Sequence, residues 1–364
     1  MQDTLGQALD RRGRNNNFML LRLLAAALVI YGHSFALAAP CGCSEWVGPG
    51  LAWSYSGELG VVIFFFMSGL LVPYSFYRRQ SLIEYAASRL LRLLPGLILF
   101  VLIMAFVIGP LTTAVPVADY LRDQEVWDFI RVNASLQSAV FYLPGVFGNA
   151  RYGPAVDGTM WTLWIEARFY LLVAFAGAFG LLRRGPIGFV ALAGLGLWMA
   201  FWPASFPFIG STDPAFARLA LYFGLGVAAF LTRDRLPLRF DLLGLVILSA
   251  LLLRGRPEYP FLLPAIIGYA VIFIAYLPTV NLPSWFGDYS YGCYLYGWPI
   301  QQLLASNFPE MGPYKMAVIA LPLSILCGAI SWHLVESRAL RMKPRPVETM
   351  VKPAAQNDTR VSSP

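Results

Sequence analysis

The chain has 364 residues, of which 58% are hydrophobic and only 13% are charged. Soluble domains carry about 25% charged residues, and here long apolar stretches recur from residue 17 to residue 336, so the composition excludes an ordinary soluble protein and predicts a membrane protein. The net charge of +7 does not indicate a nucleic-acid partner, because the basic residues cluster in alternate loops between the apolar stretches.

Ten apolar segments follow one another, and each approaches the roughly 20 residues that a helix needs to cross a bilayer. We therefore predict an all-α, polytopic membrane protein with about ten transmembrane helices. The predicted spans cover residues 17–39, 58–77, 93–115, 160–182, 187–208, 214–231, 238–253, 261–278, 285–306 and 314–336. They form one transmembrane domain, 17–337, between a cytoplasmic N-terminal segment, 1–16, and a disordered cytoplasmic tail, 338–364.

The first apolar segment also has features of a signal peptide. Three arginines precede it, and residues 35–39, Phe-Ala-Leu-Ala-Ala, are similar to a cleavage site. At about 22 residues, however, the segment is longer than a typical signal core, and it contains Arg22 and His33. We interpret it as a retained first span.

The positions of the lysines and arginines orient the chain. If the N-terminus is inside, 18 of them fall in the inner loops and tails and 6 in the outer loops. Because cytoplasmic loops carry the excess of basic residues, we predict that both termini are cytoplasmic. The longest outer segment, 116–158, mixes acidic and apolar residues, which predicts that part of it is a helix lying on the membrane surface.

The four Cys and two His residues form no metal-binding pattern. Cys41 and Cys43 lie in one short loop and are too close for an ordinary bridge between elements, while Cys293 and Cys327 lie in apolar segments. Without a paired Cys/His cluster of zinc-like spacing, we predict no metal and no permanently bound cofactor.

Two ionisable residues lie in the first span, where charge is costly and usually functional. Arg22 and His33 are 11 residues apart, which places them on one face of a helix and about 16 Å apart along its axis. Two interpretations are open: a functional pair, or a snorkelling arginine and a hydrogen-bonded histidine in a packed bundle.

Four arginines lie at the inner end of the second and third spans. They are Arg78, Arg79, Arg89 and Arg92. Guanidinium groups bind phosphate through paired hydrogen bonds, which predicts that this cluster binds an anionic co-substrate. Anchoring by the positive-inside rule explains the same residues equally well.

Glu166 lies about 9 Å into the membrane if the fourth span begins at the outer side. His33 lies at a comparable depth, so the carboxylate could orient the imidazole as a catalytic base. The alternative is that Glu166 forms a structural ion pair with Arg218 or Arg168.

Residues 288–299 are unusually polar and aromatic for a membrane segment. Pro299 and the glycines predict a kinked or broken helix that lines a cavity, although Trp and Tyr also anchor spans at the membrane surface. Ser68, next to Gly69 in the second span, is either a substrate contact or part of a close helix packing site. The candidate substrate contacts are Ser68, Trp161, Tyr291, Tyr294 and Trp298.

Five motifs in this order resemble the acyltransferase-3 family of membrane acyltransferases, over roughly residues 18–337. Each motif is weak alone, but five in register on a ten-span chain are specific together. They are Arg22 and His33 with ten residues between them, Gly-Val-Val-Ile-Phe-Phe-Phe-Met-Ser-Gly at 60–69, Arg-Leu-Leu-Arg-Leu-Leu-Pro at 89–95, Trp-Thr-Leu-Trp-Ile-Glu at 161–166 with Phe169 and Tyr170, and Ser-Tyr-Gly-Cys-Tyr-Leu at 290–295.

The resemblance implies transfer of an acyl group, commonly acetyl, from cytoplasmic acyl-CoA to a hydroxyl of a lipid-linked or surface glycan, or of another glycosylated acceptor. It also implies the inner membrane of a bacterium. His33 matches the family's key histidine and Arg22 its partner, and an imidazole suits the role because it titrates near neutral pH. Family members often have a second histidine where this chain has Gly297. The chain is expected to act without the esterase-like extra domain of some relatives.

A transporter or flippase of a lipid-linked saccharide is the alternative, since it would also use intramembrane Arg, His and Glu residues. Many transporters consist of two related halves. The sequence has no evident internal repeat, which favours the acyltransferase.

Overall fold

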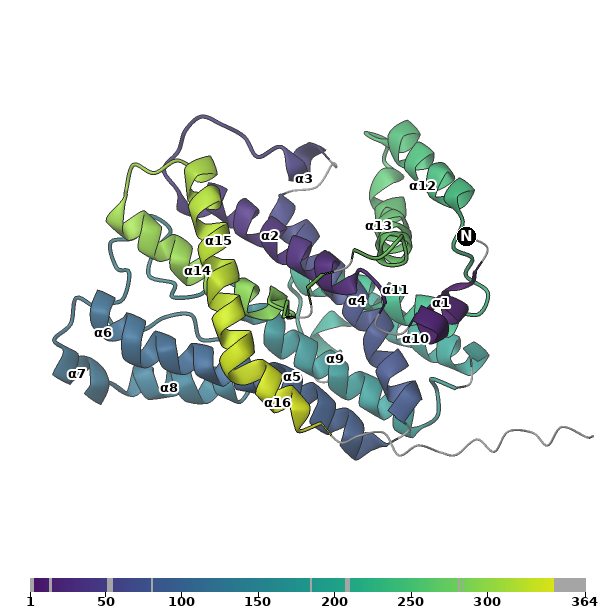
Figure 1. The fold of residues 1–364 in the computed structure, drawn as a ribbon, viewed down its shortest axis with the longest axis horizontal. Helices are drawn as coiled ribbons and strands as arrows, with labels where there is room; N and C mark the ends of the chain where they lie inside the picture. The colour runs from purple at the N-terminus through teal and green to yellow at the C-terminus, as the bar shows by residue number, and fades with distance from the viewer. Residues whose placement is uncertain are drawn as a thin grey trace, which may run out of the picture.

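The computed structural model describes residues 3–12, 15–50, 55–79, 81–183, 185–206, 210–280, 282–283 and 285–343. In this part of the chain every extended regular element is a helix (Figure 1). The long helices are α2 (Phe18–Leu37), α4 (Ser56–Arg79), α5 (Leu82–Ile103), α9 (Trp161–Ala178), α10 (Gly185–Phe201), α11 (Pro214–Leu231), α12 (Phe240–Leu253), α13 (Tyr259–Ala275), α14 (Ser290–Asn307) and α15 (Pro313–Ser331). The short ones are α1 (Leu5–Arg12), α3 (Val47–Gly50), α6 (Gly109–Thr112), α7 (Val117–Arg122), α8 (Gln124–Ala134), α16 (Ser337–Arg341), the 3₁₀ turn η2 (Pro203–Ser205) and the π-helical turns η1 (Met104–Ile108) and η3 (Trp332–Glu336).

Each of the ten predicted spans corresponds to one long helix, but the third and tenth have different bounds. The third helix begins at Leu82, not at residue 93, and continues through η1 and α6 to Thr112. We had placed Arg89 and Arg92 in a loop because they are charged, whereas α5 carries both. The tenth continues through η3 and α16 to Arg341, past the predicted start of the tail at 338. Residues 344–364 of that tail lie outside the described residues.

Five helical segments are long and apolar enough to cross a membrane by length and composition. They are 18–37, 56–79, 82–112, 214–231 and 313–341. Helices α10, α12 and α13 are equally apolar but shorter. Helix α12 has no buried residue, and side chains such as Leu197 on α10 and Leu251 on α12 are mostly exposed. Such wide apolar surfaces fit a lipid environment, as expected of a membrane protein.

The core is built around α14, whose residues 290–299 are all buried. It packs against α2 and α15, and α2 in turn packs against α4, which pairs with α11. Small residues bring these helices together: a Cβ at Gly69 would lie 2.0 Å from the carbonyl oxygen of Phe223, and one at Gly292 would lie 2.6 Å from Gly328. The packing interpretation of Gly69 is therefore confirmed. Helix α14 runs unbroken through Pro299, so the alternative of a broken helix is wrong.

The outer segment 116–158 contains the helices α7 and α8, as predicted in part. Helix α8 buries Val126 and Phe129 against the body of the protein and leaves Trp127 exposed. Figure 1 shows α7 and α8 at the opposite edge of the molecule from α12 and α13. In another loop, Cys41 and Cys43 form a disulfide with each other, a local bridge rather than one between elements.

An apolar groove of about 640 Å³ runs between α9, α10 and α11. Phe169 and Leu172 of α9, Leu192 of α10 and Leu221 of α11 are among its lining residues, and Arg218 is its charged member. The Phe169 ring also packs at 5.9 Å from the ring of Phe65, so a layer of aromatic side chains separates this groove from the polar cavity on the other side of α9.

Candidate functional site

A polar cavity of about 130 Å³ lies among α2, α4, α5, α9 and α14. Its walls combine apolar side chains with a set of charged and hydroxyl groups. Those polar lining residues are Arg22, Ser68, Arg89, Arg92, Thr162, Glu166, Tyr170, Ser290, Tyr291 and Tyr294. The cavity therefore brings together five of the motifs that the sequence singled out.

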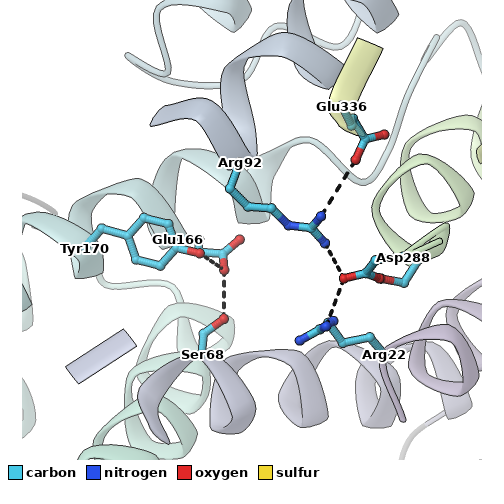
Figure 2. Close-up of polar contacts among 8 residues, drawn as sticks. Arg22, Ser68, Arg92, Glu166, Tyr170, Asp288 and Glu336 are labelled. Carbon is cyan, nitrogen blue, oxygen red and sulfur yellow. Dashed lines mark hydrogen bonds and ion pairs between the residues drawn. The ribbon is translucent and has the colours of Figure 1, made fainter. Parts of the chain in front are cut away.

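Two arginines at one end of the cavity share the carboxylate of Asp288, just before α14 (Figure 2). Nη2 of Arg22 lies 2.8 Å from Oδ2 of Asp288 and Nη2 of Arg92 lies 2.7 Å from the same atom. The hydroxyl of Ser290 donates to the other oxygen at 2.6 Å. Because charges removed from water are tolerated only when they are paired and hydrogen-bonded, Asp288 is the residue that stabilises these two partly buried arginines.

A second carboxylate approaches Arg92 from η3. Oε2 of Glu336 lies 3.8 Å from Nη1 of Arg92, and Oε1 of Glu336 accepts a hydrogen bond of 2.9 Å from Ser331. Glu336 is only 2% exposed. It lies in a π-helical turn, and such turns are frequently found at functional sites. These contacts place Glu336 in the charged network with Arg92 and Asp288.

Glu166 forms a separate cluster on the facing wall (Figure 2). Its Oε1 accepts hydrogen bonds from the hydroxyls of Ser68 at 2.8 Å and Tyr170 at 2.6 Å. Tyr170 stands one helical turn further along α9, and its carbonyl oxygen accepts a hydrogen bond from Tyr85 on α5. Glu166 thus fixes α9 to α4 and directs polar groups into the cavity.

The structural ion pairs predicted as the alternative for Glu166 are not formed. Arg168 donates instead to the carbonyl oxygens of Leu136 and Gln137 in the outer segment, and Arg218 pairs with Glu58. The sequence could not distinguish these partners. Two carboxylates, Glu58 and Glu166, and two guanidinium groups, Arg168 and Arg218, could pair in more than one way.

The four inner arginines divide into two groups. Arg89 and Arg92 line the cavity, and the Arg89 guanidinium lies 5.6 Å from the centre of the Tyr170 ring. Arg78 and Arg79 lie outside it: Arg78 is exposed and 3.9 Å from Asp10 of α1, and Arg79 is 3.8 Å from Glu84. The cavity therefore uses only the pair that α5 carries.

His33 lies outside the cavity lining, near the C-terminal end of α2. Its ring packs edge-to-face against Trp298, with centroids 4.9 Å apart, and 6.2 Å from the ring of Tyr55. Trp298 lies four residues beyond the cavity residue Tyr294 on α14, which is one helical turn or about 6 Å. Among the described residues, Nδ1 of His33 has no hydrogen-bond partner.

The structure accordingly separates the three residues predicted to act together. Glu166 bonds to Ser68 and Tyr170 rather than to His33, and Arg22 pairs with Asp288. Depth estimated from helix ends was misleading, because Glu166 faces the middle of α4, where Ser68 lies, whereas His33 is near the outer end of α2. Arg22 and His33 still lie on one face of α2, at different positions along its axis.

The predicted substrate contacts on α14 are held by hydrogen bonds. Tyr291 donates to the carbonyl oxygen of Leu93, and Tyr294 bonds to the hydroxyl of Thr162. Trp298 donates its indole N–H to the carbonyl oxygen of Ala155. Trp161 begins α9 as a partly buried residue packed against the core, outside the cavity lining.

At position 297 the chain has no room for the second histidine of many relatives. A Cβ on Gly297 would lie 2.7 Å from Cγ1 of Ile30 on α2. The close packing of α2 against α14 therefore leaves no space for a histidine side chain at this position.

The outer segment contributes a buried carboxyl that sequence analysis missed. Burial raises the pKa of Asp157 to about 7, although hydrogen bonds from the backbone and hydroxyl of Thr159 to Oδ1 oppose the increase. Its Oδ2 has no partner among the described residues. The next residue, Gly158, packs directly on the Trp298 ring.

Asp288 and Glu336 were also missed, though a signal for them existed. Arg22, Arg89 and Arg92 are predicted in or near the membrane, and arginines there require buried counter-charges. Asp288 and Glu336 are acidic residues at the ends of apolar segments, and charge balance would have selected them.

Comparisons with known proteins agree with this arrangement. The acyltransferase-3 family, described as an acyltransferase domain, matches residues 15–333. An O-acetyl transferase of Shigella phage Sf6 is 26% identical over 343 residues, 90% of this chain and 96% of that protein. Nodulation protein 10 of Rhizobium leguminosarum bv. viciae is 26% identical over 363 residues, 91% and 95% of the two chains. The peptidoglycan O-acetyltransferase OatA of Listeria monocytogenes is 24% identical over 339 residues, 79% of this chain and 52% of OatA. No solved structure matches the chain.

Proposed function

The chain belongs to the acyltransferase-3 family, and from that premise we propose that it transfers an acyl group, acetyl in the simplest case, from cytoplasmic acyl-CoA to a hydroxyl of a surface or lipid-linked glycan. The names of two relatives support O-acetylation, and one of them acts on peptidoglycan. The donor and the acceptor class are part of the proposal.

The observation that carries the proposal is the division of the site into two levels. Arg22, Arg89 and Arg92 line the inner cavity, where guanidinium groups suit a phosphate-bearing donor. His33 stands one turn further out with an unpartnered Nδ1. A donor entering from the arginine end would bring its thioester past Tyr294 toward the imidazole.

In the proposed reaction, His33 acts as a general base on the acceptor hydroxyl. The hydroxyl oxygen attacks the thioester carbonyl carbon, so that a C–O bond forms and the C–S bond breaks. The proton passes from the hydroxyl to His33 and from there to the thiolate of CoA. Glu166 serves this reaction from the cavity wall, by holding Ser68 and Tyr170 beside the path of the donor.

The same proposal includes the membrane arrangement. All ten long helices cross the bacterial inner membrane, with both termini in the cytoplasm, so that the arginine end faces the coenzyme pool and the His33 end faces outward. Eight of the ten are supported by their apolar composition. Helices α9 and α14 are more polar because they line the cavity.

The test uses the two histidines of the chain as a matched pair. Inside-out membrane vesicles containing the full chain are given radiolabelled acetyl-CoA, and alkali-labile label in the polysaccharide fraction is measured. We expect His33→Ala to lower transfer by about 10²–10⁴-fold, the usual contribution of a general base. His333→Ala, which loses only a contact of 3.0 Å with Tyr289 at the inner end, should keep most activity. Transfer retained in His33→Ala at normal expression would overturn the mechanism.

A further inference from the structure

Aromatic rings gather around His33 at the outer end of α2 and α14. Trp298 forms the base of this group: it is 4% exposed, and its indole N–H is used by Ala155. The rings of His33 and Tyr152 both stand edge-on to it, at centroid distances of 4.9 Å and 5.2 Å. The imidazole and Tyr152 are therefore neighbours across one buried indole.

Two of the rings are open to the outside. Tyr152 is 55% exposed and Tyr55, whose ring lies 6.2 Å from His33, is 37% exposed. Exposed aromatic faces beside a reactive group offer a surface for an apolar ligand face. The C–H faces of a sugar ring provide such a surface, while its hydroxyls point outward from the rim.

Hydrogen-bond acceptors without partners also occur on the segments next to Trp298, but they are buried. They are Oδ2 of Asp157, Oε1 of Gln301 and Oε1 of Gln302, each without a partner among the described residues. The amide nitrogens of both glutamines are already used, by Ile30 and Ser34 for Gln301 and by the backbone at Gly153 and Ala155 for Gln302. The side chains of all three residues are 0% exposed, so a ligand can reach the exposed faces of the tyrosine rings but not these atoms.

We propose that Tyr55 and Tyr152 flank His33 to form the subsite for one sugar ring of the acceptor, with the C–H face of the sugar on the tyrosine rings and its hydroxyls directed away from them. This inference rests on the proposed function and names where the acceptor binds. Tyr152 and Tyr55 bind the sugar, and Trp298 positions both the imidazole and Tyr152.

The experiment measures sugar binding without requiring acyl transfer. The full chain in detergent is mixed with methyl glycosides of glucose, galactose, rhamnose and N-acetylglucosamine, and saturation-transfer NMR detects which sugar protons contact the protein. We expect signals from the C–H protons of at least one glycoside, lost in Tyr152→Ala and kept in Tyr152→Phe, because the ring face and not the hydroxyl makes the contact.

Tyr142 provides the matched control. It lies in the same outer segment and is 53% exposed, close to the value for Tyr152, but its ring contact is with Phe141. Tyr142→Ala should keep the signals. In the transfer assay, Tyr152→Ala should raise the KM for the acceptor about tenfold and leave the KM for acetyl-CoA unchanged, as expected for the loss of one aromatic contact.

The outcomes separate this inference from the proposed function. Signals that persist in Tyr152→Ala, or that are absent for every glycoside with the unmodified chain, overturn the subsite. If the chain binds glycosides through Tyr152 but transfers no label from acetyl-CoA, the subsite stands and the acyltransferase mechanism fails.

Discussion

The inner cavity and the outer site around His33 are built from different chemistry. The inner end uses full charges: Asp288 between Arg22 and Arg92, with Glu336 beyond. The outer end uses one imidazole, aromatic rings and neutral amides. Charges fixed by counter-charges suit a phosphate-bearing donor, whereas aromatic rings suit a neutral partner with an apolar face. Under the proposed function each of the two sites recognises its own substrate, and α2 and α14, which run through both, join them.

The largest effect is expected from replacing Asp288, which pairs with two arginines of the cavity. Replacing it by Ala leaves the partly buried Arg22 and Arg92 without their shared carboxylate, and removal of one partner of a fully buried ion pair costs about 3–5 kcal/mol, which is the upper bound here. We expect a large loss of folded protein, measured by thermal unfolding in detergent and by yield. The control is Asp241→Ala, whose pair with Arg239 is exposed on both sides and should unfold as the unmodified chain does. Equal stability of the two variants would show that the inner network is not a structural necessity.

Arg89 sharpens the comparison, because it lines the cavity without belonging to the Asp288 network. Arg89→Ala should raise the KM for acetyl-CoA about 10–100-fold, the value of one or two charge-assisted hydrogen bonds, and leave the KM for the acceptor unchanged. Arg79→Ala, which disrupts a pair with Glu84 outside the cavity, should change neither. A rise in the KM for the acceptor alone would contradict the assignment of the cavity to acetyl-CoA.

The smallest expected effect is a pH dependence at the outer end. Because the pKa of Asp157 is about 7 in the folded chain and near 3.8 when exposed, the folded state holds a proton that the unfolded state releases between these values. Stability therefore falls as pH rises through that window. Asp157→Asn removes this dependence, so its Tm relative to the unmodified chain should increase by about 2 °C or more between pH 4.5 and 7.5.

The exposed Asp119 of α7 is the control for this measurement. Asp119→Asn should follow the pH curve of the unmodified chain. Parallel curves for Asp157→Asn and the unmodified chain would contradict the burial of a protonated carboxyl at position 157.

The architecture could be predicted from sequence because it depends on local properties. Apolar segments of helical length identified all ten long helices, and the motifs identified the family. The error at the start of α5 arose where local rules fail: Arg89 and Arg92 read as loop residues until their partners across the bundle are known. Hydropathy cannot anticipate a charge that a distant helix neutralises.

The site could be predicted in its members but not in its pairings. His33, Ser68, Tyr291 and Tyr294 are at the predicted cavity or beside it. The roles of Glu166 and Arg22 were assigned by depth along single helices, and the structure gives each another partner. Asp288, Glu336 and Asp157 were missed because contacts between segments far apart in sequence, not the residues' own surroundings in the chain, determine their function.

The π-helical turn η3 has an evolutionary consequence. Such a turn is equivalent to an α-helix with one residue inserted, and each residue advances a helix by about 100°. Loss of a single codon in 332–336 would close the wide turn into an ordinary α-helix, so the residues of the turn itself would take new positions and Glu336 would move relative to Arg92. The contact between Glu336 and Arg92 therefore depends on the number of residues in this stretch as well as on the identity of residue 336.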